Sequence, residues 1–150
     1  ARTCAAIGAT LHMVKPYGFD TSDAAVKKNM KRAGLDYWDK VKIIEYDNLE
    51  DFKQKTKGKK MYLLSTKSKK SHTDIKYEDE AYLVFGPETR GLPEDFILEN
   101  FENAARIPMR DIIRSLNLSN AVAIVAYEAE RQLNYKDLLE VSPYFDKKLK

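Results

Sequence analysis

Short apolar runs alternate with helical segments along most of this chain, and this alternation limits the possible folds more than any other feature. The clearest run is 81–85, AYLVF, which is continuous, rich in aromatic residues and stopped by Gly86-Pro87. Similar runs lie at 11–14, 41–46, 61–65 and 104–109. Strands that alternate with helices predict an α/β fold built on a mostly parallel sheet.

The segments between these runs carry helix signals. Four helices are expected: residues 3–8 as the end of a short helix stopped by Gly8, 22–33 ended by Gly34, 49–56, and 93–100 with Pro93 in its first turn. The strongest helical pattern covers 118–133, with Ser119 or Asn120 as the expected N-cap. Residues 66–79 are polar and lack a period, which predicts a loop.

Composition excludes several classes of protein. The 150 residues are 43% hydrophobic and 33% charged, which is typical of one globular domain covering 1–150. No apolar run is long enough to span a membrane, and the single cysteine, Cys4, cannot form an internal disulfide. We therefore expect a cytoplasmic protein without membrane contact. We also expect that an N-terminal strand precedes Ala1.

Neither a metal site nor a strong charge signal stands out. His12 and His72 lack neighbouring ligands at metal-binding spacing, so no metal is expected, and Cys4 is more typical of a buried apolar residue than of a nucleophile. The net charge is only +3, but lysines cluster at 53–60, 67–70 and 147–150. Such clusters bind nucleic-acid phosphates in some proteins and form an ordinary solvated surface in others.

Three segments follow the predicted strands and carry the chemistry of interest. Ligands of parallel α/β sheets bind beyond the carboxyl ends of the strands, which directs attention to 64–67, 86–93 and 106–121. The second segment, GPETRGLP, is neither a P-loop nor a dinucleotide fingerprint. The third places several small polar residues before an apolar helix, more than one cap requires. Each segment, taken alone, is also compatible with an ordinary turn.

Together these segments resemble a known family. LVFGPETRGLP at 83–93 resembles the second motif of the SPOUT RNA methyltransferases, and IPM at 107–109 with RSLNLSNA at 114–121 resembles the third. RTCAA at 2–6 resembles the tail of the first motif, and YEA at 127–129 is most similar to the TrmL/YibK group. The resemblance implies an α/β domain with a C-terminal deep trefoil knot, a homodimer, and S-adenosylmethionine (SAM) as methyl donor, with S-adenosylhomocysteine (SAH) as product.

The same resemblance implies which residues serve the reaction. Those expected to contact SAM are Leu64, Gly86, Glu88, Ile107, Met109, Ser115, Leu116 and Asn120, with Glu88 and Asn117 also holding the loops. Arg2 corresponds to the arginine proposed to activate the ribose hydroxyl, and Tyr127 to a tyrosine near the active site and dimer interface. Since a guanidinium stays protonated, Arg2 could instead orient the ribose or bind its phosphate. Tyr37 and Trp38 could stack on an unpaired base or pack in a core or dimer contact.

The function implied by the resemblance is 2′-O-methylation of the wobble nucleotide of tRNA, a cytidine or uridine derivative at position 34. The tRNA anticodon stem-loop is then the expected partner, and the lysine clusters are candidate contacts. Two alternatives remain open: a 2′-O-methyltransferase acting on another tRNA or ribosomal RNA site, and a non-catalytic RNA-binding protein of the same fold.

Overall fold

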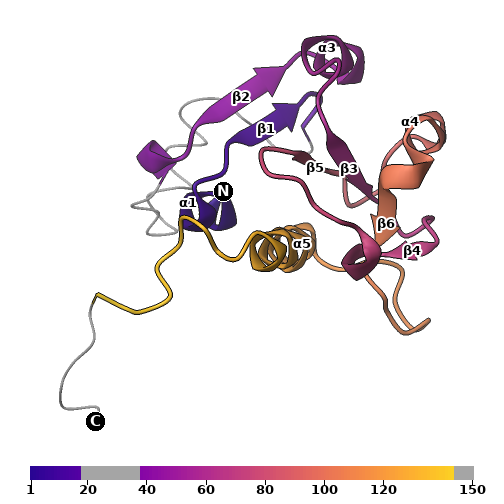
Figure 1. Cartoon of the computed structure of the whole chain (residues 1–150). Coiled ribbons are helices and arrows are strands. Elements are labelled where there is room, and N and C mark those ends of the chain that lie inside the picture. The colour runs from indigo at the N-terminus through magenta and orange to yellow at the C-terminus, as the bar shows by residue number, and fades with distance from the viewer. Residues whose placement is uncertain (18–37, 144–150) are drawn as a thin grey trace.

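The strands of this computed structural model, which describes residues 1–17 and 38–143, form two parallel sheets (Figure 1). β1 (Leu11–Val14) pairs with β2 (Ile43–Tyr46) in the smaller sheet. The larger sheet has the order β4-β6-β3-β5, with bounds β3 (Met61–Leu64), β4 (Lys70–Ser71), β5 (Tyr82–Phe85) and β6 (Ala104–Arg106). All of these pairings are parallel, so the predicted α/β class with a parallel sheet is confirmed.

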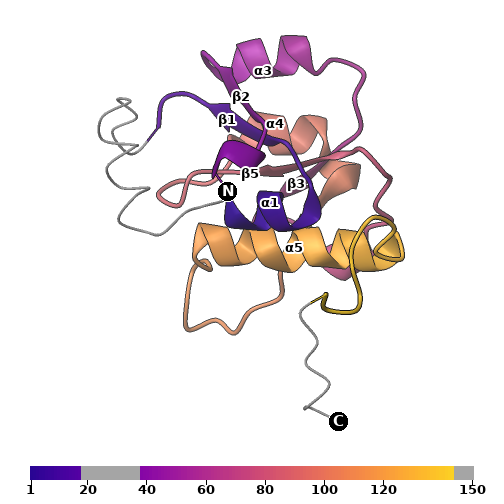
Figure 2. The same cartoon turned by 90° about the vertical axis from the view of Figure 1, so that its left-hand side faces the viewer.

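Helices cover both faces of the sheets. Figure 2 shows α3 (Leu49–Lys55) and α4 (Glu94–Glu99) on one side and α1 (Arg2–Ile7) and α5 (Leu118–Gln132) on the other. Three 3₁₀ turns complete the described elements: η1 (Trp38–Lys40), η2 (His72–Asp74) and η3 (Phe101–Asn103). No helix in the described ranges is both long and apolar enough to cross a membrane.

Strand β3 separates two hydrophobic cores. Successive strand residues point to opposite faces, so Leu63 packs with Phe52 and Phe96 beneath α3 and α4, whereas Tyr62 packs with Val125 beneath α5. Leu63 and Val125 are both fully buried. Because side chains alternate along this central strand, a layer of helices packs against each face of the sheet.

Local signals account for where several helices begin and end. α1 ends at Gly8, whose φ of 70° is the left-handed conformation that glycine adopts without strain. α3 begins after Asn48, whose side-chain oxygen accepts a hydrogen bond of 2.8 Å from the backbone N–H of Asp51. Both helices were expected from the sequence. Cys4 is buried in α1, as predicted.

Several predicted boundaries are wrong. Residues 66–79 contain β4 and η2, because a capping box between Ser71 and Asp74 orders a turn too short to show a period. The strand predicted at 41–46 begins at Ile43, and the one predicted at 104–109 ends at Arg106, shortly before Pro108, which lacks the N–H that a sheet ladder needs.

The caps of the last two helices also differ from expectation. Pro93 is the N-cap of α4 and does not lie in its first turn. The cap of α5 is Asn117, not Ser119 or Asn120, because its side-chain oxygen accepts hydrogen bonds from the Asn120 N–H at 3.2 Å and the Ser119 hydroxyl at 2.5 Å. The predicted helix at 22–33, Tyr37, the Trp38 side chain and the lysines at 147–150 lie outside the described residues.

Candidate functional site

A cavity of about 680 Å³ lies at the carboxyl ends of β3, β5 and β6. The strand order β6-β3-β5 brings these ends together at one edge, where parallel α/β sheets bind their ligands. The volume is within the range of small-molecule sites. Its wall comes from the three segments identified in the sequence: Leu64, Ser65, Thr66, Lys67, Phe85, Gly86, Pro87, Glu88, Thr89, Arg90, Gly91, Leu92, Ile107, Met109, Arg114, Ser115, Leu116, Leu118 and Ala121.

The loop at 86–93 folds back tightly on itself, and two glycines permit this. A Cβ on Gly86 would lie 2.3 Å from both the carbonyl carbon of Gly91 and the nitrogen of Leu92, so no side chain fits there. Gly91 has a φ of +71°, and its N–H donates a 2.9 Å hydrogen bond to the Pro87 carbonyl. The loop therefore has a defined shape that exposes backbone groups to the cavity.

Glu88 joins this loop to the beginning of α5. Its carboxylate accepts a 2.9 Å hydrogen bond from the backbone N–H of Leu118, the first residue of the helix. A carboxylate is favourable at this end because the first N–H groups of a helix lack backbone partners and carry partial positive charge. Glu88 and the N-cap Asn117 therefore hold the second and third segments against each other.

The cavity wall combines apolar side chains with cationic ones. Phe85 and Met109 contribute apolar surface, while Lys67, Arg90 and Arg114 bring positive charge. Lys67 pairs with Glu94, whereas Arg90 and Arg114 have no ion-pair partner in the part of the chain that the structure describes. A ligand with an apolar body and anionic or carboxylate groups suits such a wall.

The structure brings most of the predicted cofactor residues together. Leu64, Gly86, Glu88, Ile107, Met109, Ser115 and Leu116 all line the cavity. Asn120 does not, since it lies exposed in the first turn of α5 and its backbone N–H is capped by Asn117. Among the lining residues, Arg90 and Arg114 were not singled out in the sequence. Their place inside the two motif segments is the signal that would have identified them.

The two predicted catalytic residues lie outside the cavity wall. Arg2 is the first residue of α1, which packs against α5, and Tyr127 is 44% exposed on α5. Ile124, one helical turn earlier, is 40% exposed. Ile124 and Tyr127 thus form an exposed apolar strip on the helix that carries the cavity's third segment.

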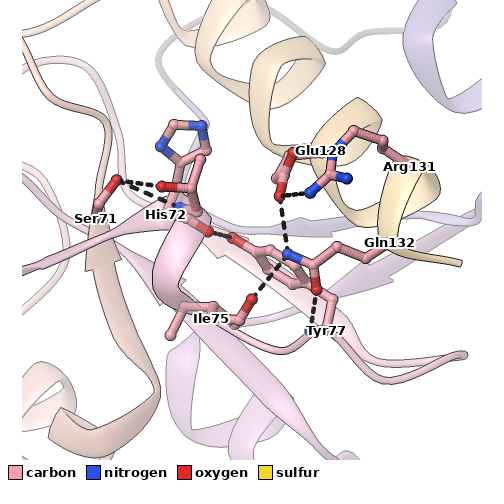
Figure 3. Close-up of polar contacts among 8 residues, drawn as sticks. Ser71, His72, Ile75, Tyr77, Glu128, Arg131 and Gln132 are labelled. Atoms are coloured by element: carbon pink, nitrogen blue, oxygen red, sulfur yellow. Dashed lines mark hydrogen bonds and ion pairs between the residues drawn. The ribbon is translucent and has the colours of Figure 1, made fainter.

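A polar network fixes the second half of α5 against the segment between β4 and β5 (Figure 3). The Gln132 side-chain oxygen accepts a hydrogen bond from the Tyr77 N–H at 3.0 Å, and its amide donates to the Ile75 carbonyl and to Glu128, both at 2.9 Å. Arg131 donates two hydrogen bonds of 2.9 Å to Glu128. Together these donors lower the pKa of Glu128 to about 2.

The histidines are not arranged as metal ligands. Nδ1 of His12 lies 2.8 Å from the Tyr46 hydroxyl, and burial, followed by the charge of Lys42, lowers the pKa of His12. Nδ1 of His72 is buried without a hydrogen-bond partner among the described residues. Within 1–17 and 38–143, no group of three histidine, cysteine, aspartate or glutamate side chains could hold a metal ion.

Many of the clustered lysines are paired with carboxylates. Lys53 pairs with Glu99 at 2.9 Å, and Lys70 with Glu102 at 3.2 Å. Lys55, Lys60 and Lys67 also have acidic partners. For these residues the interpretation as a solvated, ion-paired surface is favoured over a dedicated phosphate contact.

Comparison with known proteins identifies the family. Residues 1–127 match the SpoU rRNA Methylase family. The chain belongs to this family. The predicted resemblance to the SPOUT methyltransferases is therefore confirmed, and the cavity is built by the segments that carry the second and third motifs.

Individual SpoU relatives are similar over most of the chain. A Listeria monocytogenes protein, provisionally named a tRNA (cytidine(34)-2′-O)-methyltransferase, is 47% identical over 99% of this chain and 87% of its own length. A solved structure described as giving insights into the 2-OH methylation of C/U34 on tRNA is 41% identical, with a TM-score of 0.79 over 90% of this chain and 86% of that one.

A more distant solved structure is an AdoMet-bound rRNA methyltransferase from Sinorhizobium meliloti. It is 28% identical to this chain and has a TM-score of 0.67. It covers 88% of this chain, which spans 49% of that protein. AdoMet is SAM, the methyl donor expected from the sequence.

Proposed function

We propose that this SpoU protein transfers a methyl group from SAM to the ribose 2′-hydroxyl of nucleotide 34, a cytidine or uridine derivative, in tRNA. The observation that carries the proposal is the single cavity formed by both motif segments at the strand ends and joined by the Glu88–Leu118 hydrogen bond. The Listeria monocytogenes relative is named for methylation of cytidine 34, and the structure with a TM-score of 0.79 concerns 2-OH methylation of C/U34 on tRNA. SAH is then the second product.

The cavity residues fit SAM. The apolar wall, including Phe85, Ile107 and Leu116, suits an adenine ring, and the exposed backbone of the 86–91 turn suits its hydrogen-bonding edge. When bound, SAM supplies an electrophilic methyl group on a sulfonium. The protein's part is then to position the acceptor in line with that group, since orientation contributes much of the rate in such displacements. Asn120 is proposed to act through the first turn of α5 and not through the cavity wall.

The residues proposed to act on the ribose that accepts the methyl group come from another face of the chain. Arg2 and Tyr127 lie outside the cavity, while Ile124 and Tyr127 form an exposed apolar strip. We propose a homodimer that buries this strip and brings Arg2 and Tyr127 to a cavity at the subunit interface. There a guanidinium that stays protonated orients the ribose or its phosphate and stabilises charge on the 2′-oxygen, while another group takes the hydroxyl proton.

Two further parts of the proposal concern topology and location. The segments at 86–93 and 107–121, which are joined by the hydrogen bond between Glu88 and the Leu118 N–H, are proposed to belong to the deep trefoil knot of SPOUT proteins. A tRNA substrate and the absence of a cysteine framework support a cytoplasmic location.

The experiment that tests the proposal is methyl transfer from labelled SAM to bulk tRNA lacking the wobble modification, followed by nucleoside mapping. Label on the 2′-oxygen of nucleotide 34 is the expected result. Label on a 2′-oxygen at another tRNA position or on ribosomal RNA would show that the proposed substrate is wrong and that the proposed reaction is right. SAM binding without transfer to any RNA, combined with RNA binding, would favour a non-catalytic RNA-binding protein.

A further inference from the structure

The loop between β6 and α5 exposes two adjacent isoleucines. Ile112 is 79% exposed and Ile113 is 50% exposed. Figure 2 shows this loop extending from the start of α5 on the side of the helix away from the sheet. Its neighbours at 109 and at 114–116 line the cavity. An apolar pair of this kind contributes nothing to the core and lies beside the proposed reaction site.

Positive charge flanks the isoleucines on both sides. Arg110 and Arg114 are exposed and have no ion-pair partner among the described residues. Asp111 offsets one of these charges, and Arg90 adds another from the opposite loop of the cavity. Unpaired guanidiniums beside exposed apolar side chains complement a polyanion with stacked bases, and they disfavour a like-charged surface of a second copy.

We propose that residues 110–114 form an RNA-reading loop for the substrate of the proposed function. Ile112 and Ile113 insert beside a base next to nucleotide 34, and Arg110 and Arg114 bind the adjacent phosphates. This inference rests on the proposed activity and adds a substrate-binding element that borders the SAM cavity and shares Arg114 with its wall.

The geometry of the acceptor gives the physical reason for such a loop. Nucleotides of an anticodon loop stack on one another, and a stacked ribose can be held away from a recessed methyl donor. Apolar side chains that insert between bases unstack them, and arginines hold the backbone in the distorted form. Recognition of single-stranded RNA generally uses bases that are splayed out in this way.

The test compares the double variant I112S/I113S with the matched control L139S/V141S. Leu139 and Val141 are 81% and 76% exposed, so the control removes similar apolar surface elsewhere. We expect I112S/I113S to raise the KM for tRNA by about tenfold, the scale of one lost base contact. The affinity for SAM, measured by calorimetry, should stay unchanged in both variants, which also shows that both fold.

A fluorescent probe tests the insertion directly. An anticodon stem-loop with 2-aminopurine at position 33 or 35 should brighten when saturated with the wild-type protein, because unstacking removes quenching. The I112S/I113S variant at saturation should leave at least one of these probes dark. The R110Q variant should reduce the magnitude of the slope of log affinity against log salt by about 1, which corresponds to the loss of one phosphate contact.

Other outcomes would overturn the inference. If I112S/I113S matches the control in KM and fluorescence while the wild type methylates nucleotide 34, the loop does not read RNA and the proposed function stands. If the variant instead changes the sedimentation mass, the isoleucines contact a second copy. If the wild type neither binds the stem-loop nor methylates tRNA, the proposed function fails and this inference fails with it.

Discussion

Arg2 is the residue whose role is easiest to separate from cofactor binding. It begins α1 and lies outside the cavity wall, so the R2A variant should keep its SAM affinity within about twofold. Methylation should fall by about a hundredfold or more, the usual effect of removing one donor that stabilises charge in the transition state. Single-turnover transfer and calorimetry measure the two quantities.

The R2K variant is the matched control for Arg2. Lysine keeps the charge but lacks the planar guanidinium. Partial rescue by R2K indicates a phosphate or charge contact, whereas no rescue indicates that the guanidinium geometry orients the ribose. Equal loss of SAM binding and transfer in R2A would make Arg2 structural.

Glu128 should make stability depend on pH. Hydrogen bonds from Arg131 and Gln132 lower the pKa of Glu128 from 4.5 to about 2 in the folded protein. A lowered folded pKa stabilises the protein above the unfolded value, and this stabilisation is lost as pH falls from about 5 towards 2. The difference in unfolding free energy between wild type and E128Q, from urea titrations, should therefore shrink over that range. A constant difference would contradict the assignment.

At the scale of elements, Glu88 tests whether the two cavity loops depend on each other. The E88A variant removes the acceptor for the Leu118 N–H at the start of α5. Loss of a helix cap costs about 1 kcal/mol, and the loops it joins then lose their fixed spacing. We expect the Kd for SAM to rise by about tenfold in E88A and by less in E88Q, which keeps an acceptor oxygen.

Glu94 provides the control for this experiment. Glu94 follows the 86–93 loop as the first residue of α4. Its side chain is 72% exposed and pairs with Lys67, a residue of the cavity wall. Exposed ion pairs contribute little, so E94Q should bind SAM almost as the wild type does. Similar losses in E94Q and E88A would attribute the effect to the general negative charge near the cavity.

Gln132 joins two elements that are far apart in sequence. Its side chain satisfies the Tyr77 N–H and the Ile75 carbonyl, so Q132A leaves both backbone groups without their partner. We expect a loss of about 2 kcal/mol in unfolding free energy and a Tm lower by about 4–8 °C. Q54A, at an exposed position of α3, should leave Tm nearly unchanged. A small effect of Q132A would mean that water replaces the lost contacts.

At the scale of the whole molecule, the proposed dimer predicts the sedimentation mass of the protein and predicts that methylation requires the dimer. Sedimentation should give twice the 17.3 kDa chain mass for the wild type. Placing two carboxylates on the exposed strip, in I124E/Y127E, should give monomers because buried like charges are costly. Methylation should be lost. A wild-type monomer with full activity would contradict the dimer.

Much of the fold and part of the site could be predicted because their causes are local. The apolar run at 81–85 specifies a strand, Gly8 stops a helix through its positive φ, and the cavity loops follow the strand ends wherever a parallel sheet forms. The two motif segments were sufficient to identify the family. Nearly all residues that they assigned to the cofactor line one cavity.

Only the tertiary structure decided the rest, because long-range contacts determine it. Several residues near 117–120 could cap a helix by composition, and Asn117 became the cap of α5, whose first N–H is bonded by Glu88, 30 residues away. Val125 is buried, whereas Tyr127 on the same helix and Ile112 in the preceding loop are exposed. Sequence periodicity reports which residues are apolar. Which of them find a partner depends on the packing of segments that are distant along the chain.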